Sequence, residues 1–421
     1  MTPRLSARGR AVPASPIRTL VPLGDQAKAR GLRVLHLNIG QPDIETPAPM
    51  RQRIADLHEK VYAYTPSGGT AEYLAALREY YRRLGFTLGL DEILGTTGGS
   101  EALFFALCAV GDQGDEVIVV EPYYTNYSAF ATLAGLHLVP LTSRGEDGFH
   151  LPPREAWEKA LTPRTRAVIL CNPSNPTGTV YTREEVEMVA GFCRDHGLFL
   201  VSDEVYREFA YDGRAAVSAL SLAGAEEMVI VVDSLSKRYS ACGIRLGCLV
   251  TRNREAYGAA LRMAQARLSP PGLAQVAACA LTELGPDYTR GVVTEFQARR
   301  DMLYEAVSAI PGVFLRKPEG AFYFVARLPV KDAEDFARFL LTDFEHEGCT
   351  VMVAPARGFY ATPGLGADEV RIAYVLERGA LALAVRALEA GLTAYGSARR
   401  DKDRAVVAVG GGPDLHRPAE G

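Results

Sequence analysis

The sequence has no long apolar segment and no large excess of charge of either sign. None of its apolar runs reaches the roughly 18 residues that a membrane-spanning helix needs, so we expect no association with a membrane. Its 46 basic and 50 acidic residues give a formal net charge of -4. That balance provides no broad positive field for a phosphate backbone, so nucleic acid is not an expected partner.

The seven cysteines are scattered and show no CxxC spacing. Their odd number argues against a closed set of disulfides, and neither they nor the seven histidines have the spacing of metal ligands. We therefore expect no metal site and a cytoplasmic location. The first two dozen residues are rich in arginine and faintly resemble a transit peptide, but three prolines interrupt them. We favour an extended arm there, and we find no secretory signal.

A chain of 421 residues is long enough for two or three domains. Between residues 90 and 252, short β-rich apolar runs alternate with helical patterns, which is typical of an α/β domain with a mostly parallel sheet. The clearest helix is predicted over 182–197, where Thr182 begins an acid-rich first turn and Gly197 provides a stop.

From about residue 290 the pattern changes to that of a smaller α+β unit, with helices over 294–310, around 332–347 and near 377–394. We divide the chain into an arm with the start of the small domain (1–50), a large domain (51–290), a small domain (291–396) and a tail (397–421). The tail carries glycine, proline and charge without sustained periodicity, so we expect it to be flexible.

Polar groups follow four of the predicted strands. In open parallel sheets, ligands bind beyond the carboxyl ends of the strands, so one site could hold all of these groups. They are the pair Tyr123 and Tyr124 after "VIVVE", Asn175 in the loop after "AVILC", Asp203 and Tyr206 after "LFLVS", and Lys237 after "VIVVD".

The segment "TTGGSEALFFAL" (96–107) predicts a glycine turn that leads into a helix beginning near Ser100. Free backbone N–H groups and the positive end of the helix dipole would form a seat for an anion. Gly98 and Gly99 would let a phosphate approach the backbone closely. The segment is not a Walker A loop, because no GK[ST] follows it.

An anion seat, an arginine, a flat aromatic ring, a carboxylate and an amine are the groups needed to hold pyridoxal 5'-phosphate. The amine of Lys237 would react with the aldehyde, and for this it needs a lowered pKa, which burial near a cation supplies. Asp203 would face the ring nitrogen and keep it protonated. Arg245 would then face the phosphate rather than the lysine.

The motifs "NPSNPTG", "SDEVY" and "SLSKRYSACGIRLG" follow one another along the chain. In combination they resemble the fold-type I pyridoxal-phosphate enzymes of the class I/II aminotransferase family, the aspartate aminotransferase-like group, over roughly residues 15–395. The resemblance implies an α/β fold, with a mostly parallel mixed sheet flanked by helices in the large domain and a smaller α+β domain. It also implies a homodimer.

The resemblance implies a role for each matching residue around the cofactor, and Lys237, Asp203 and Tyr206 form the catalytic set. Lys237 would be the Schiff-base lysine and proton shuttle, Asp203 the partner of the pyridinium nitrogen, and Asn175 with Tyr206 the partners of the phenolic oxygen. Tyr124 would lie on the ring face. The implied phosphate ligands are Gly99, Ser100, Ser234 and Arg245.

Three further matches concern the substrate and a second subunit. Gly40 in "HLNIGQPD" would lie against the substrate carboxylate, which Arg371 in "DEVRIAY" would clamp in a bidentate pair. Asn175 would also contact the substrate. Tyr64, in "YAYTPSGG", would reach the phosphate of the neighbouring subunit.

The implied reaction moves an amino group between an L-amino acid and a 2-oxo acid by a ping-pong mechanism, with aspartate as one candidate donor and 2-oxoglutarate as the expected acceptor. In some members a basic residue on the phosphate-loop helix recognises the distal acid of a dicarboxylate. Here Ser100 and Glu101 occupy that place, which leaves the distal acid without an identified partner. An arginine from the partner chain is one alternative.

Two other classes of function remain open at this point. A β-lyase, racemase, decarboxylase or amino acid oxidase would use the same cofactor residues, because substrate orientation selects the bond that breaks. A ligand-sensing transcriptional regulator would need a basic helix-turn-helix module ahead of this domain. Only about 35 residues precede "LNIGQPD", so we do not expect a regulator.

Overall fold

The computed structural model describes residues 3–410, with side chains up to residue 398. Its largest sheet has seven strands in the order β2-β8-β7-β6-β5-β3-β4. Six of them run in the same direction, and only β8 of these seven is reversed, being antiparallel to both β7 and β2, so the expected mostly parallel mixed sheet is confirmed. The strands are β2 (Ile93–Thr96), β3 (Glu116–Glu121), β4 (His137–Thr142), β5 (Thr165–Cys171), β6 (Phe199–Asp203), β7 (Val229–Ser234) and β8 (Gly247–Thr251).

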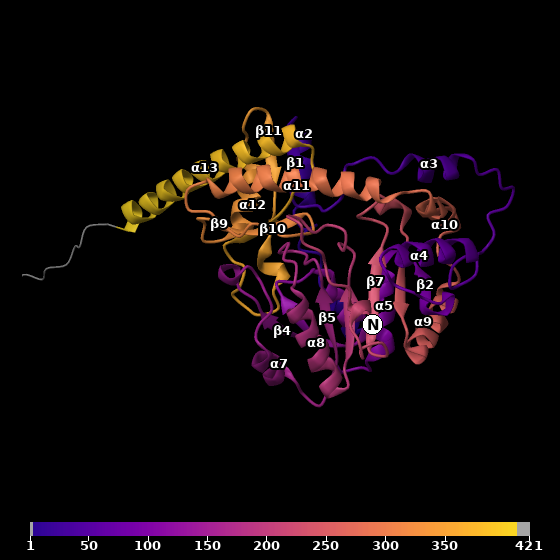
Figure 1. Cartoon of the computed structure of the whole chain (residues 1–421). Coiled ribbons are helices and arrows are strands. Elements are labelled where there is room, and N and C mark those ends of the chain that lie inside the picture. The colour runs from indigo at the N-terminus through magenta and orange to yellow at the C-terminus, as the bar shows by residue number, and fades with distance from the viewer. Residues whose placement is uncertain (1–2, 411–421) are drawn as a thin grey trace, which may run out of the picture.

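Helices cover both faces of this sheet, as Figure 1 shows. Because side chains alternate along a strand, Ile118 and Val120 of β3 pack in one core, and Val117 and Val119 pack in the other. The first core includes α4 (Ala71–Arg83), α7 (Arg154–Ala160) and α8 (Arg183–His196), and the second includes α5 (Gly98–Val110), α6 (Asn126–Ala134) and α9 (Arg254–Arg267). Burial on both faces explains why the strands read as continuous apolar runs.

The helix predicted over 182–197 is α8, and its ends form as the sequence indicates. Thr182 accepts a hydrogen bond from the backbone N–H of Glu185, whose carboxylate accepts one from the N–H of Thr182. This reciprocal pair is a capping box. Gly197 ends the helix in the left-handed conformation, at a φ of 64°.

A second group of elements lies above the large sheet in Figure 1 and shares a separate hydrophobic core. Strand β1 (Arg33–His36) pairs in parallel with β11 (Cys349–Met352), and an antiparallel sheet follows the order β12-β13-β10-β9. Those four strands are β12 (Ala354–Pro355), β13 (Glu369–Ala373), β10 (Tyr323–Arg327) and β9 (Phe314–Leu315). The helices are α2 (Val21–Ala29), α11 (Pro286–Ser308), α12 (Ala333–Thr342) and α13 (Arg378–Gly410).

Three helix boundaries differ from the sequence prediction. Helix α11 begins at Pro286 rather than 294, since proline suits the first position of a helix. Helix α12 ends at Thr342 rather than 347, because the chain turns through Glu347 and Gly348, both with positive φ, to enter β11. Helix α13 runs to Gly410 rather than 394, so part of the predicted 397–421 tail is helical, and residues 411–421 lie outside the described residues.

The remaining helices lie at the edges of the molecule. They are α1 (Ala7–Ala11), α3 (Ala48–Ala55) and α10 (Gly272–Ala278), and α3 packs against α10. Within residues 3–410, none of the helices is both long and apolar enough to cross a bilayer.

Candidate active site

Lys237 lies in the turn that follows β7, and its amine is close to the segment after β1 that carries Gly40. Its Nζ donates to the carbonyl of Gly40 at 2.8 Å and is 3.8 Å from Cys242 Sγ. Burial lowers the pKa of Lys237, and the positive charges of Arg371 and Arg245 lower it further, against the opposing effect of Cys242. The amine is therefore more easily deprotonated, and so more nucleophilic, than a surface lysine.

A buried ion pair holds the two ends of this turn together. Arg238 donates two hydrogen bonds to Asp233, at 2.8 and 2.9 Å, and Asp233 also accepts one from the backbone N–H of Ser234 at 2.7 Å. Arg207 is a second cation beside the same carboxylate. Because Lys237 is adjacent to Arg238 in the chain, this pairing fixes the backbone that carries the amine.

Asp203 is the last residue of β6, between Cys171 of β5 and Val232 of β7. Its Oδ2 accepts a 2.6 Å hydrogen bond from Tyr127, a residue that the sequence reasoning missed. Burial raises the pKa of Asp203 to about 6, although the Tyr127 hydrogen bond opposes the shift. A buried carboxyl in this state gains most from a cationic partner such as a protonated ring nitrogen.

The helix predicted to begin near Ser100 is α5, and it begins at Gly98, two residues earlier. Gly98 has a φ of +78°, and a Cβ there would lie 2.6 Å from a guanidinium nitrogen of Arg245, so this close approach requires glycine. A Cβ on Gly99 would lie 3.5 Å from the Cβ of Ser234. The structure thus brings the glycine turn, Ser234 and Arg245 together.

Arg371, on β13, is buried between two aromatic rings, with its guanidinium carbon 4.5 Å from the ring centre of Tyr323 and 5.1 Å from that of Phe359. It donates to Asn175 Oδ1 at 3.2 Å and to the carbonyl of Asn38. Within residues 3–398, its Nε has no hydrogen-bond partner and its guanidinium forms no ion pair with an acidic side chain. A buried guanidinium with an unpartnered nitrogen of this kind is suited to bind a carboxylate ligand.

Tyr323 was not predicted from the sequence, yet its hydroxyl is 3.0 Å from that of Tyr206. A Cβ on Gly40 would lie 1.6 Å from the same hydroxyl, so only glycine fits at that position. Gly40, Tyr206 and Tyr323 therefore lie together beside Arg371 and Lys237. Tyr323 lies in none of the motifs quoted above. Asn38 lies within "HLNIGQPD", but that motif drew attention only to Gly40.

Tyr123 and Tyr124, the two tyrosines that follow β3, differ in their burial. Tyr123 is buried in the core, where it bonds to Ser128 at 2.9 Å and stacks on Tyr127. Tyr124 is only partly buried and meets Tyr127 edge to face, with ring centres 5.6 Å apart. Tyr124 is therefore the one available to a ligand.

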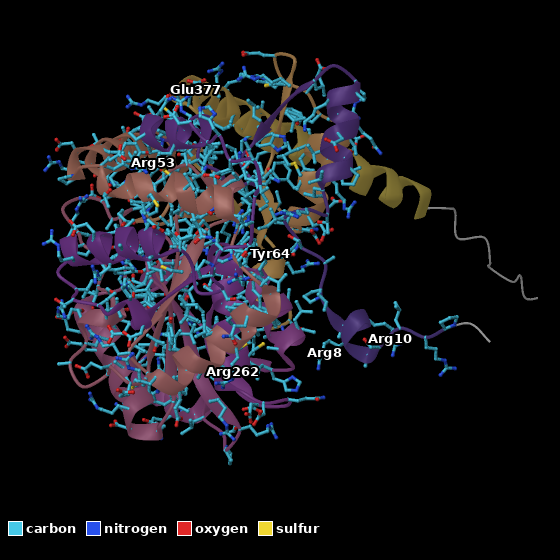
Figure 2. All side chains as sticks on the ribbon, turned by 90° about the vertical axis from the view of Figure 1, so that its right-hand side faces the viewer. Arg8, Arg10, Arg53, Tyr64, Arg262 and Glu377 are labelled. Atoms are coloured by element: carbon cyan, nitrogen blue, oxygen red, sulfur yellow. The ribbon has the colours of Figure 1, made fainter. Side chains whose placement is uncertain are left out.

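Tyr64 does not reach these residues within the same chain. Its side chain is 79% exposed on the segment between α3 and α4, where Figure 2 shows it at the surface. The expected contact of Tyr64 with the phosphate of a neighbouring subunit stays a prediction.

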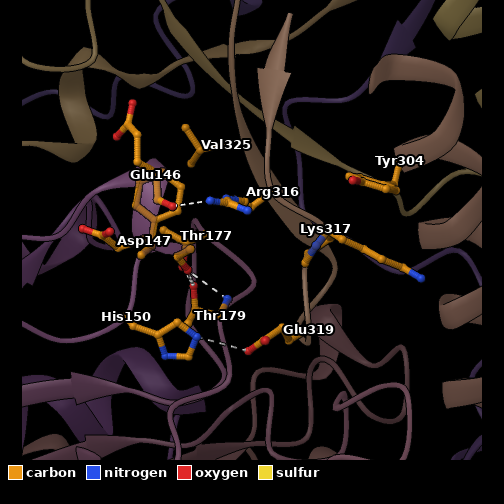
Figure 3. Close-up of a pocket in the computed structure, with 13 residues that line it drawn as sticks. Glu146, Asp147, His150, Thr177, Thr179, Tyr304, Arg316, Lys317, Glu319 and Val325 are labelled. Carbon is orange, nitrogen blue, oxygen red and sulfur yellow. Dashed lines mark hydrogen bonds and ion pairs between the residues drawn. The ribbon is translucent and has the colours of Figure 1, made fainter. Parts of the chain in front are cut away.

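A separate pocket of about 470 Å³ lies beyond the loop that carries Asn175 (Figure 3). Thr177 and Thr179 line it, and none of the predicted site residues does. His150 on its wall is 2.9 Å from Glu185 and 3.8 Å from Glu319, and the hydrogen bond to Glu185 raises the pKa of His150. We assign the pocket no role in the candidate site.

The converging groups fit pyridoxal 5'-phosphate. The start of α5, with the guanidinium of Arg245 beside Gly98, suits a phosphate, the acid at position 203 suits a ring nitrogen, and the amine at 237 suits an aldehyde. Arg371 keeps an unpartnered Nε for a substrate carboxylate.

Comparison with known proteins agrees with this chemistry. The family model for aminotransferase class I and II matches residues 33–388. A probable aspartate/prephenate aminotransferase from Aquifex aeolicus is 30% identical over 393 residues, which cover 92% of this chain and 98% of that protein. An aspartate aminotransferase from Rhizobium meliloti is 32% identical over 375 residues, covering 84% of this chain and 90% of the relative.

Solved structures share the fold over nearly the whole chain. A single mutant of Thermus thermophilus aspartate aminotransferase superposes with a TM-score of 0.84 and 30% identity, and covers 93% of this chain and 100% of its own. An alanine aminotransferase from Pyrococcus furiosus has a TM-score of 0.83 and 28% identity, with the same coverage. An aspartate aminotransferase and an alanine aminotransferase are thus about equally similar to this chain in fold, so the fold does not distinguish a dicarboxylic from a neutral amino acid substrate.

Proposed function

The chain belongs to the aminotransferase class I and II family and is a pyridoxal-phosphate-dependent transaminase, and we propose that it uses aspartate as the amino donor and 2-oxoglutarate as the acceptor. Several relatives are named as aspartate aminotransferases, which supports aspartate as the donor. Two features of the site support a transaminase most directly. One is the lowered pKa of the Lys237 amine, and the other is the buried Arg371 with its unpartnered Nε.

The cofactor, when bound, supplies a ring that accepts electrons while a bond at the substrate Cα breaks. Arg371 binds the α-carboxylate, and Asn175, already bonded to Arg371, helps to fix its orientation. Lys237 removes the proton from the substrate Cα and returns it on the cofactor side, which its lowered pKa favours near neutral pH. Asp203, held by Tyr127, keeps the ring nitrogen protonated.

We assign the phosphate to the start of α5 and the turn after β7. Gly99 and Ser100 lie in the first turn of α5, where free backbone N–H groups and the positive end of the helix dipole favour an anion. Ser234 and Arg245 complete the ligand set from the other side. Asn175 and Tyr206 would hold the phenolic oxygen, with Tyr124 on the ring face.

We propose a homodimer in which Tyr64 reaches the phosphate site of the neighbouring subunit. Val61, Tyr62 and Tyr64 are 75%, 68% and 79% exposed on one segment, and adjacent exposed apolar side chains of this kind mark interfaces.

The separate hydrophobic cores support a division into a large domain over 51–290 and a small domain over 291–396, with the 1–50 arm joined to the small domain. We also propose a cytoplasmic location.

The test uses purified protein loaded with the cofactor. We expect L-aspartate alone to bleach the visible absorbance of the bound cofactor, and 2-oxoglutarate to restore it, as a ping-pong cycle requires. Release of pyruvate and ammonia, without restoration by any 2-oxo acid, would instead favour a β-lyase. Sedimentation equilibrium of the wild type and of Tyr64→Phe tests the dimer, and a monomer at enzyme-assay concentrations would contradict the interface.

A further inference from the structure

The segment Pro16–Leu20 crosses from the N-terminal arm to α2 at the edge of the candidate site. Ile17 packs against a small hydrophobic cluster that includes Phe359, the ring that flanks Arg371. The Ile17 carbonyl accepts a hydrogen bond from the side chain of Asn38 at 3.5 Å. Leu20 is buried in the main core of the small unit. The backbone is therefore fixed on both sides of Arg18, which lies between these two residues.

Arg18 is a cation without a counter-charge. Its side chain is exposed, and among the described residues it makes no hydrogen bond or ion pair; only its backbone does, with Ser15 and Val21. A guanidinium that remains unpaired next to a ligand site is available to bind an anion. The neighbouring residue, Ile17, accepts a hydrogen bond from the Asn38 side chain, and the Asn38 carbonyl accepts one from Arg371. These two bonds bring the segment with Arg18 close to the position of the substrate carboxylate.

Electrostatics place Arg18 in the same neighbourhood. Burial raises the pKa of Tyr124, and the positive charges of Arg371, Arg18 and Arg245 oppose that shift. Tyr124 therefore lies within the field of three arginines. Arg371 is assigned to the α-carboxylate and Arg245 to the phosphate, which leaves the third arginine for a third anionic group.

The helix start offers no competing cation. Glu101, beside Ser100, accepts hydrogen bonds from the backbone N–H of Thr97 at 2.8 Å and from Arg267 at 3.1 Å. Arg267, the cation that pairs with Glu101, also donates to the carbonyl of Gly95. Its charge is therefore already paired by Glu101.

We propose that Arg18 determines specificity by binding the distal carboxylate of a dicarboxylic substrate, so that this enzyme prefers aspartate or glutamate to neutral amino acids. The inference rests on the proposed function, because it assumes that Arg371 holds the α-carboxylate. A charged hydrogen bond of this kind is worth about 10- to 100-fold in binding or rate. The exposed position of Arg18 means that its replacement should leave the fold intact.

The first experiment compares the wild type with Arg18→Met, Arg18→Lys and a control, Arg8→Met, which alters an exposed arginine on α1 (Figure 2). The rate at which each amino acid bleaches the cofactor absorbance is measured for aspartate, glutamate and alanine. We expect Arg18→Met to lower kcat/KM for the dicarboxylic amino acids about 10- to 100-fold, with alanine little changed. Arg18→Lys should recover part of the loss, and Arg8→Met should behave as the wild type.

The second experiment measures binding without turnover, by calorimetry with succinate and propionate, which differ by one carboxylate. Arg18→Met should weaken succinate and leave propionate unchanged. Equal losses for aspartate and alanine, or no loss for succinate, would overturn the role of Arg18, as would a wild type that reacts only with neutral amino acids. If no amino acid bleaches the wild type, the proposed function fails, and the succinate comparison still decides whether Arg18 binds a second carboxylate.

Discussion

The phenol of Tyr127 donates a 2.6 Å hydrogen bond to Asp203 Oδ2, joining the first turn of α6 to the carboxyl end of β6. This bond stabilises the ionised carboxylate against the burial that raises its pKa to about 6. The position of Asp203 and its charge therefore both depend on Tyr127.

Replacing Tyr127 with phenylalanine should weaken cofactor binding about 10-fold, since the carboxylate loses a charged hydrogen bond and becomes easier to protonate. Titration of the apoprotein with pyridoxal phosphate, followed by absorbance, measures the effect. Tyr123→Phe is the matched control, because that hydroxyl bonds to Ser128 instead. Equal affinities for the two variants would show that Tyr127 does not support the carboxylate.

Asp203 should make the stability of the cofactor-free protein depend on pH. Its pKa is about 6 in the fold against 3.8 as the ordinary value, so the unfolded chain releases the proton first as pH rises. The contribution of Asp203 to the free energy of unfolding therefore falls between about pH 4 and 6 and stays low above that range. The variant Asp203→Asn should not show this fall in the free energy of unfolding, because asparagine does not titrate.

Urea unfolding of both cofactor-free proteins checks the sign. Near pH 4 the wild type and Asp203→Asn should differ little, and at pH 7 the variant should be more stable by about 3 kcal/mol. The same variant, loaded with cofactor, should lose most transaminase activity. A stability difference that is constant from pH 4 to pH 7 would contradict the raised pKa.

Arg238 and Asp233 should stabilise the fold as a coupled pair. Both are fully buried, and Arg238→Met would leave the carboxylate of Asp233 with a single, more distant cation, Arg207, beside its hydrogen bonds from Tyr81 and from the backbone N–H of Ser234. Breaking a buried pair on one side typically costs about 3–5 kcal/mol. Denaturant unfolding should show a loss of this size for Arg238→Met.

The double variant Asp233→Asn/Arg238→Met should lose less than the sum of the two single losses, because the interaction between these two side chains can be lost only once. Strict additivity would show that the two side chains do not interact. A loss below about 1 kcal/mol for Arg238→Met would show that the pair is not needed to hold the Lys237 turn.

The part of the site that lies at one edge of the parallel sheet could be predicted from the sequence. Asn175, Asp203, Tyr206 and Lys237 each follow a strand, and parallel strands deliver their carboxyl ends to the same edge. The helix α8 was predictable for a similar reason, since its capping box depends only on residues close in the chain.

The contacts that could not be predicted join distant parts of the chain. Tyr323 and Asn38 belong to the other group of elements and meet the sheet edge only through tertiary packing. Tyr127 lies three residues after Tyr124, and nothing in that spacing shows that its hydroxyl points back to Asp203. The pairing of Arg238 with Asp233 could not be predicted, because the sequence does not show that the turn after β7 folds this guanidinium back onto the strand.

The central claim is that the amine of Lys237 bonds to the cofactor. The protein is incubated with pyridoxal phosphate, reduced with borohydride, digested and mapped by mass spectrometry, with Lys237→Ala as the control. We predict one stable modification, on Lys237, that is absent from the variant, together with a complete loss of turnover in the variant. Modification of a different lysine, or turnover retained by Lys237→Ala, would contradict the account.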